Sequence, residues 1–236
     1  MNAKAEMVLD ALRQQGDGHT PAGIAYQLES LRKSGNTAAA ECFERKLARL
    51  RIPVDGQNDL YFRNNILGLG REIVIANRLA EQGFIITVEP CGRKGPDLGI
   101  EIDRWSGYVE VKRLVLHEKL RTTDDDFWKK LEAVMRDGSR QFSESQNNIL
   151  AVVDFRSAGS IPAQDTIKKI FEGEPGHFSK IAAVLYISGT SSISSGCFLN
   201  EYSLGNVPEQ VLARLSAIAD DSDSRWHNLA PGAVPI

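Results

Sequence analysis

Cysteine pairs and long apolar runs are both missing from this sequence. The chain has only three cysteines in 236 residues, Cys42, Cys91 and Cys197, and they are far apart. An odd number at such spacing argues against a disulfide framework and a zinc site, and it favours a reducing cytoplasm. No apolar run is long enough to span a bilayer, and the first residues lack the apolar core of a signal peptide. We therefore expect a cytoplasmic protein without a membrane partner.

An excess of positive charge is also missing. The formal net charge is −3, from 28 Lys and Arg against 31 Asp and Glu. Proteins that bind nucleic acid through bulk electrostatics usually carry a positive excess, so any such binding here must come from a local patch. A nuclease that gathers carboxylates around a metal ion is less basic overall, so the charge leaves a metal-dependent enzyme open.

Several common catalytic motifs have no counterpart in the chain. The four histidines show no metal-ligand spacing, and there is no Walker loop and no nucleophile elbow. The "GLG" of residues 68–70 is too short for the dinucleotide-binding fingerprint and does not follow a convincing strand.

The patterning that is present predicts an α/β protein. Hydrophobic residues make up 42% and charged residues 25% of the chain, as in globular proteins. Residues 1–54 predict a helical N-terminal subdomain, with three amphipathic segments and a net charge of +2 over residues 1–52 (eight Lys and Arg, six Asp and Glu). In residues 55–236 helical and strand patterns alternate, which predicts a mixed central sheet flanked by helices, with a C-terminal helix and tail.

The second region divides into elements by hydrophobic period. Helices are expected within 65–83, 122–148, 163–173 and 207–220, and strands within 83–90, 95–114 (two), 149–155, 180–188 and 196–203. In the helix of 122–148, one apolar stripe is predicted, formed by Phe127, Leu131, Val134 and Phe142.

The stretch "GPDLGIEIDRWSGYVEVKRL", residues 95–114, predicts a β-hairpin that carries four acidic residues. Period-two alternation puts the apolar side chains on the core face, namely Leu98, Ile100, Ile102, Val109 and Val111. The other face then carries Asp97, Glu101, Glu110 and Lys112, with Asp103 near the turn. A one-residue slip would place valines among the carboxylates, so it is disfavoured.

The spacing of the two strands leaves more than one register open. A four-residue loop at 104–107 would pair Ile102 with Val109 and leave Asp97 about 13 Å from Glu110 along the strands, too far to share an ion. A pairing shifted by two residues, with Asp97 opposite Lys112, or a bulge at Gly99, would close this gap. A metal site therefore requires one of these two arrangements, whereas a solvated surface hairpin is compatible with any.

Clustered carboxylates on one strand face suit a hard divalent cation. Mg²⁺ binds through one or two carboxylates and keeps several waters, so Asp97, Glu110 and the backbone carbonyl of Val111 are candidate ligands. Lys112, the next residue on this face, would orient a water or neutralise charge on a phosphate.

These residues resemble a known family. Pro96-Asp97 followed by Glu110-Val111-Lys112, with a separation of 110 − 97 = 13, is similar to the motif of the PD-(D/E)XK nuclease superfamily, the restriction-endonuclease-like fold. The resemblance covers about residues 65–155 and implies a core of a helix, three strands, a helix and a fourth strand. It also implies a Mg²⁺ (or Mn²⁺) cofactor, with Glu72 on the first core helix as a further metal ligand. Arg140 and Gln141, on the helix after the motif lysine, are implied as auxiliary residues.

The sequence gives weaker evidence of a functional role for other side chains near the motif. Arg93 and Lys94 stand in a glycine-flanked loop and would contact phosphate if they are not simply solvated. Glu101 is better explained as a solvated strand residue. Trp105, at the expected hairpin tip, is predicted to be exposed and available for stacking.

Together these features predict a metal-dependent endonuclease that hydrolyses phosphodiester bonds, with DNA favoured over RNA as the nucleic-acid partner. A homodimer is plausible because many proteins of this fold cut two strands as dimers. The alternatives are an RNA-directed nuclease, a catalytically silent nucleic-acid-binding or assembly module of the same fold, and an unrelated α/β protein with a chance motif.

Overall fold

The structure of the chain is a computed structural model that describes residues 1–53, 59–92, 94–114, 124–143, 147–154, 163–188 and 195–220. These residues form eight helices and six strands, which confirms the predicted α/β class. Their contacts divide them into two compact units, one from Met1 to Val88 and the other beginning at Glu89. Each unit is described by itself.

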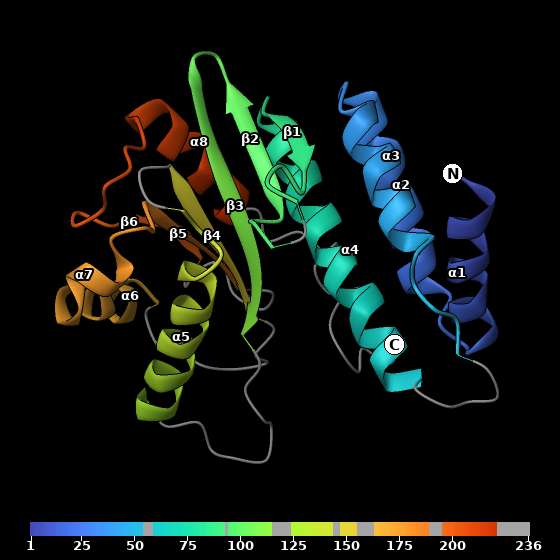
Figure 1. Ribbon diagram of the computed structural model, residues 1–236, viewed down its shortest axis with the longest axis horizontal. Coiled ribbons are helices and arrows are strands. Elements are labelled where there is room, and N and C mark those ends of the chain that lie inside the picture. The colour runs from blue at the N-terminus through green and yellow to red at the C-terminus, as the bar shows by residue number, and fades with distance from the viewer. Residues whose placement is uncertain are drawn as a thin grey trace. The chain divides into compact units, whose positions relative to one another are not determined.

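The first unit is mainly helical (Figure 1). Its elements are α1 (Ala3–Gln14), α2 (His19–Lys33), α3 (Thr37–Leu47), α4 (Asp59–Glu81) and β1 (Ile85–Val88). The three predicted N-terminal helices are present, and α4 begins at Asp59, before the predicted start. The helix α2 packs on both α3 and α4, so the unit extends beyond residue 54. Asn36, at the cap position of α3, does not cap this helix with its side chain, which instead accepts from the N–H of Ile86, 2.8 Å away, and so joins the helices to β1.

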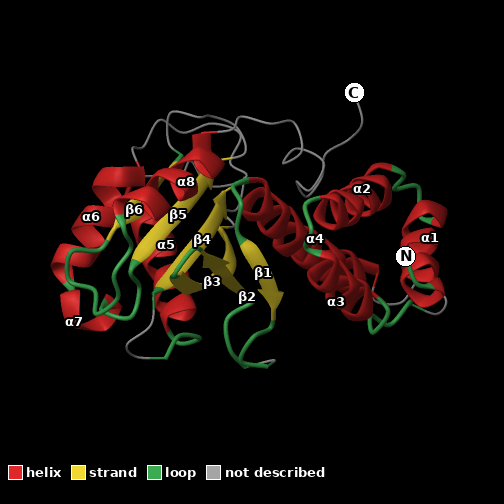
Figure 2. Cartoon of the chain, turned by 90° about the horizontal axis from the view of Figure 1, so that it is seen from above, coloured by secondary structure: helices red, strands yellow, loops and turns green. Residues whose placement is uncertain are grey.

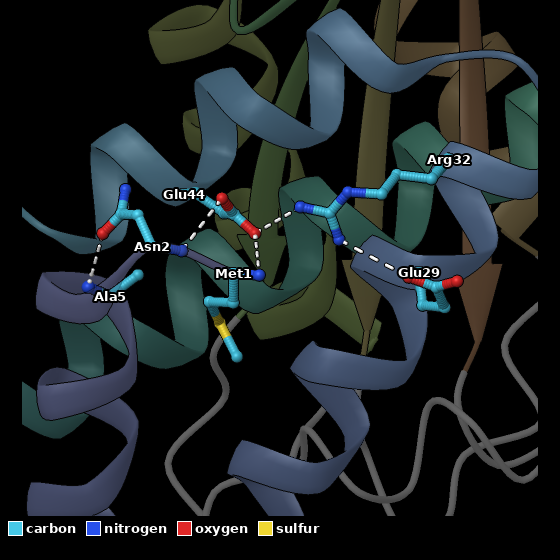
Figure 3. Close-up of polar contacts among 6 residues, drawn as sticks. All are labelled: Met1, Asn2, Ala5, Glu29, Arg32 and Glu44. Atoms are coloured by element: carbon cyan, nitrogen blue, oxygen red, sulfur yellow. Dashed lines mark hydrogen bonds and ion pairs between the residues drawn. The ribbon is translucent and has the colours of Figure 1, made fainter.

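A buried carboxylate joins the first three helices (Figure 3). Glu44 of α3 is 6% exposed and forms a short ion pair with Arg32 of α2. Its carboxylate also lies 3.4 Å from the α-amino group of Met1 and accepts from the N–H of Asn2 at 3.2 Å. Asn2 in turn caps α1, because its side chain accepts from the N–H of Ala5 at 2.9 Å. Thus one carboxylate of α3 links the start of α1 to the last turn of α2.

The second unit contains an open mixed sheet with helices on both faces (Figures 1 and 2). Its elements are β2 (Leu98–Ile102), β3 (Trp105–Leu114), α5 (Asp124–Ser139), β4 (Asn148–Asp154), α6 (Ala163–Gly173), α7 (Pro175–Phe178), β5 (Ala183–Ser188), β6 (Gly196–Leu199) and α8 (Glu209–Asp220). The strands lie in the order β2-β3-β4-β5-β6. The β3–β4 and β4–β5 pairs are parallel, whereas β2–β3 and β5–β6 are antiparallel, as a mixed sheet requires. The short helix α7 was not predicted.

One face of this sheet is covered by α5, α6 and α7, and α8 packs on β5 and β6 (Figure 2). The core under α5 includes Phe127, Leu131, Met135, Phe142, Leu150 and Val152. Sequence periodicity predicted Val134 rather than Met135 in this stripe, but Val134 is only half-buried. All seven residues of β4 are buried, which agrees with its prediction as a central strand.

All three cysteines, which lie in described segments, are free thiols, as their number and spacing predicted. Within the described ranges, no helix combines the length and the apolar character that a bilayer crossing requires.

Candidate active site

The β2–β3 hairpin closes in two residues rather than four. Ile102 pairs with Trp105, so Asp103 and Arg104 alone form the turn. Asp103 has φ 53°, a left-handed conformation that aspartate tolerates better than most residues, and this lets the chain reverse so tightly. The pairing of Ile102 with Val109, one of the registers that the sequence left open, is therefore wrong. The alternatives, Asp97 opposite Lys112 or a bulge at Gly99, are wrong too, because Gly99 pairs regularly with Tyr108.

The tight turn nevertheless brings the two motif acids together. The register ends with Leu98 opposite Val109, so the position of Asp97 falls opposite Glu110. The carboxylate of Asp97 accepts a hydrogen bond from the N–H of Val111 at 2.9 Å. That N–H belongs to the peptide bond that joins Glu110 to Val111, so both acidic side chains flank one peptide unit.

A closed loop holds Asp97 in this place. The N–H of Glu89 donates to the carbonyl of Asp97 at 2.7 Å, which closes the loop between β1 and β2. Inside it, the N–H of Gly95 donates to the carbonyl of Gly92 at 3.1 Å. A Cβ atom added at Gly95 would lie 2.5 Å from the Cβ of Cys91, so glycine is required for the close approach.

Strand geometry also directs a backbone carbonyl to this position. The N–H of Tyr108 donates to Asn147, on the side of β4. Since the N–H and C=O of one residue point to the same neighbour and alternate along a strand, those of Val111 point to the β2 side. The β2 strand has already ended there, so this alternation directs the Val111 carbonyl to the Asp97 side.

Glu110 is the most unusual group of the site. It is 5% exposed, and its Oε1 atom lies 3.0 Å from the Lys112 ammonium, while Oε2 is buried and has no hydrogen bond to any residue that the structure describes. Burial and the nearby charge of Asp97 raise the pKa of Glu110 to about 7, although Lys112 and the Asp97 backbone lower it in part. A buried carboxylate beside a second negative charge is stabilised by a cation.

Lys112 bridges two carboxylates from different elements. Besides Glu110, it contacts Asp137 of α5, with 2.7 Å between Nζ and Oδ2. Burial disfavours its charged form, but the hydrogen bonds to Asp137 and Glu110 outweigh burial and raise the pKa of Lys112. Sequence reasoning missed Asp137. The available signal was its spacing, three residues after Val134, which places it at the edge of the buried face of α5.

The donor set fits a magnesium-like ion. Asp97 and Glu110 supply two carboxylates, and Val111 supplies a carbonyl, all of them hard oxygen donors. In the described part of the chain, no group of three or more His, Cys, Asp and Glu side chains is arranged to hold a metal. Mg²⁺ does not require such a group, because it binds through one or two carboxylates and keeps several waters. The buried Oε2 of Glu110 is the atom that most needs a cation.

The other implied site residues lie in different surroundings. Glu72 is in α4 of the first unit, where its carboxylate contacts the Lys46 ammonium of α3 at 2.6 Å. Arg140 and Gln141 form the turn after α5, where their N–H groups donate to the carbonyls of Asp137 and Gly138. Within the described residues, the Lys112 side chain forms ion pairs with Glu110 and Asp137, and neither Lys112 nor Glu110 forms one with this turn.

The residues predicted to contact nucleic acid differ in how exposed they are. Lys94 is exposed in the loop that ends at Asp97, whereas Arg93 lies outside the described residues. Trp105 was predicted to be exposed, but it is half-buried, and its indole N–H donates to the carbonyl of Asn206 at 2.9 Å. Val111, predicted to face the core, is only half-buried, because β3 continues beyond the end of β2.

Comparison with known proteins identifies no relative, since no protein-family model, curated protein or solved structure matches the chain. The chemistry of the site is therefore inferred from its own residues.

Proposed function

We propose that this protein is a Mg²⁺-dependent endonuclease of the restriction-endonuclease-like fold, which hydrolyses phosphodiester bonds, in DNA rather than RNA. Asp97, Glu110 and the Val111 carbonyl would hold the ion, and Lys112 would act on the water or the phosphate.

The observation that carries the proposal is the state of Glu110. Its carboxylate is buried, and one of its oxygens has no hydrogen bond to any described residue. Burial first, and the nearby charge of Asp97 second, raise its pKa to about 7. A structural role would not favour such an arrangement, because placing a buried carboxylate beside a second negative charge costs stability. A divalent cation offsets that cost, and perturbed carboxylates of this kind are common in active sites.

The residues around this pair suit phosphoryl transfer. A bound Mg²⁺ ion would polarise the phosphodiester and lower the pKa of a water. Lys112 would hold that water and offset the charge that develops on the phosphate. In the reaction the water oxygen bonds to phosphorus, the bond to one sugar oxygen breaks, and that oxygen takes up a proton.

The order of elements supports the proposed fold. The chain runs α4, β1, β2, β3, α5 and β4, which is the order that the resemblance implies. The helix α5, which lies between the parallel strands β3 and β4 in the sequence, packs on β3 and brings Asp137 to Lys112. Lys94, exposed just before Asp97, would bring positive charge to the nucleic-acid backbone.

The test is cleavage of four substrates by the whole protein: single-stranded, double-stranded and branched DNA, and RNA, each with Mg²⁺ or Mn²⁺ and with chelator. We expect wild type to cut DNA only with metal. Asp97→Ala and Lys112→Ala should each reduce the rate by about 10²-fold or more, because each removes a group that acts at the reacting centre.

Glu101→Gln is the matched control, since Glu101 is exposed on the same hairpin. It should cut like wild type. Residual cutting at the same rate by wild type and both alanine variants would indicate a contaminant and end the proposal. Faster cutting of RNA would assign the RNA-directed alternative, and nucleic-acid binding without cutting would assign the silent module.

A further inference from the structure

We propose that Asp137 of α5 is the positioning residue for Lys112, which it holds when a divalent cation occupies the Asp97–Glu110 pair. This inference rests on the proposed function, because it concerns the same site. Nothing in the motif itself points to Asp137, which the fold alone brings to Lys112.

Lys112 has two carboxylate partners at hydrogen-bonding distance. Its Nζ atom lies 3.0 Å from Oε1 of Glu110 and 2.7 Å from Oδ2 of Asp137. Glu110 comes from the same strand, two residues away, whereas Asp137 comes from the helix that covers it. The ammonium is therefore tied to α5 by a contact that does not involve either proposed metal ligand.

The two partners also differ in their surroundings. The side chain of Glu110 is 7% exposed and that of Asp137 is 56% exposed. A solvated carboxylate loses little free energy when it shares a cation with another group, because water stabilises its charge. A buried carboxylate lacks that hydration, so its ionised form needs a cation close by. Before metal binds, Lys112 partly fills this need for Glu110.

A cation held by Asp97 and Glu110 would compete with Lys112 for Glu110, because both are attracted to the same oxygens. With Asp137 present, Lys112 keeps one charged hydrogen bond when it gives up the other. Without Asp137, Glu110 is the remaining carboxylate partner of Lys112 among the described residues, and Lys112 resists displacement. Asp137 would thus ease metal entry and keep the ammonium beside the site for the reaction.

The experiment measures Mn²⁺ affinity by calorimetry in wild type, Asp137→Asn, Lys112→Met and the double variant. We expect Asp137→Asn to weaken binding about three- to tenfold, the usual size of coupling between contacting groups. Lys112→Met should strengthen binding, because it removes the competing cation. In the Lys112→Met background, Asp137→Asn should then change the affinity by less than about twofold.

The double variant distinguishes positioning of Lys112 from a direct electrostatic attraction between Asp137 and the metal ion. If Asp137→Asn weakens Mn²⁺ binding equally with and without Lys112, Asp137 acts directly on the metal and the positioning role is overturned. Asp165→Asn, the same change at an exposed position of α6, is the control and should leave the affinity unchanged. Asp137→Glu should restore binding in part, and circular dichroism should show that each variant is folded.

Cleavage kinetics provide a second measurement. Asp137→Asn should lower kcat about tenfold and leave KM for DNA unchanged, because Asp137 orients Lys112 and does not touch the substrate. If wild type binds Mn²⁺ and cuts DNA but Asp137→Asn behaves identically, only this inference fails. If wild type neither binds Mn²⁺ nor cuts, the proposed function fails and this inference fails with it.

Discussion

At the scale of single residues, the described part of the site gathers negative charge around Glu110. Lys112 contacts Glu110 and Asp137, while the charge of Asp97 also acts on Glu110. Glu110 itself is buried and has a raised pKa. The raised pKa has a consequence for stability that can be measured without metal or nucleic acid.

The stability of the metal-free protein should depend on the protonation of Glu110. The folded state holds this proton up to about pH 7, whereas an ordinary glutamate releases it near 4.5. The folded state therefore binds more protons between these values, and its stability falls as the pH rises through this window. The contribution is on the order of 1–3 kcal/mol, fully present below pH 4.5 and lost above about pH 7.

Urea unfolding from pH 5 to 8, with chelator present, measures this effect. The difference in unfolding free energy between wild type and Glu110→Gln should fall steadily across the range, because glutamine does not titrate. Glu101→Gln, on the exposed face of the same hairpin, should give a difference that does not vary with pH. A flat difference for Glu110→Gln would show that Glu110 is ionised in the folded state throughout.

At the scale of elements, the hairpin depends on the close packing of its second strand. A Cβ atom at Gly107 would lie 2.5 Å from the carbonyl oxygen of Asn147 and 2.6 Å from the Trp105 ring. The same ring is fixed by its hydrogen bond to Asn206. Gly107 therefore allows β3 to lie against the segment before β4. This packing positions the strand that carries Glu110 and Lys112.

Gly107→Ala should destabilise the protein by about 1–3 kcal/mol, because the added methyl group has to displace backbone or an anchored ring. The free energy of urea unfolding, followed by tryptophan fluorescence, measures this change. Gly173→Ala in α6 is the matched control, since no atom lies within 4 Å of the added Cβ atom. Equal stability of the two variants would mean that the strand can shift to make room.

At the scale of the whole molecule, the first unit has a buried ionic centre of its own. Glu44 connects α3 to Arg32 of α2 and to the backbone before α1 (Figure 3). Removing Glu44 takes this buried carboxylate from both Arg32 and the Met1 α-amino group, and Glu29, 3.7 Å from Arg32, compensates only in part. Glu44→Ala should therefore lower the unfolding free energy by about 2–4 kcal/mol.

Helical circular dichroism during urea unfolding is the appropriate measurement, because the first unit is mainly helical. Glu41→Ala, at an exposed position on the same helix, is the control and should change stability by less than about 0.5 kcal/mol. If both variants unfold at the same urea concentration, the Glu44 centre contributes nothing measurable.

The sequence by itself determined the class of the fold, the order of most elements and the face that carries the acids. Hydrophobic periodicity is a local property, so alternation alone placed Asp97, Glu110 and Lys112 together on the face opposite Leu98 and Val109. The same reasoning identified β4 as a buried strand. It could not detect α7, which is one short turn, or choose between Val134 and Met135 on α5.

The tertiary structure decided how near these groups come to one another. The hairpin register depends on one left-handed residue, Asp103, and its local sequence is compatible with longer turns as well. Asp137 meets Lys112 only because α5 packs across β3, a contact between positions that no sequence period relates. The raised pKa of Glu110 likewise arises from burial under that packing, so the charged hairpin of the sequence becomes a candidate metal centre only in the folded protein.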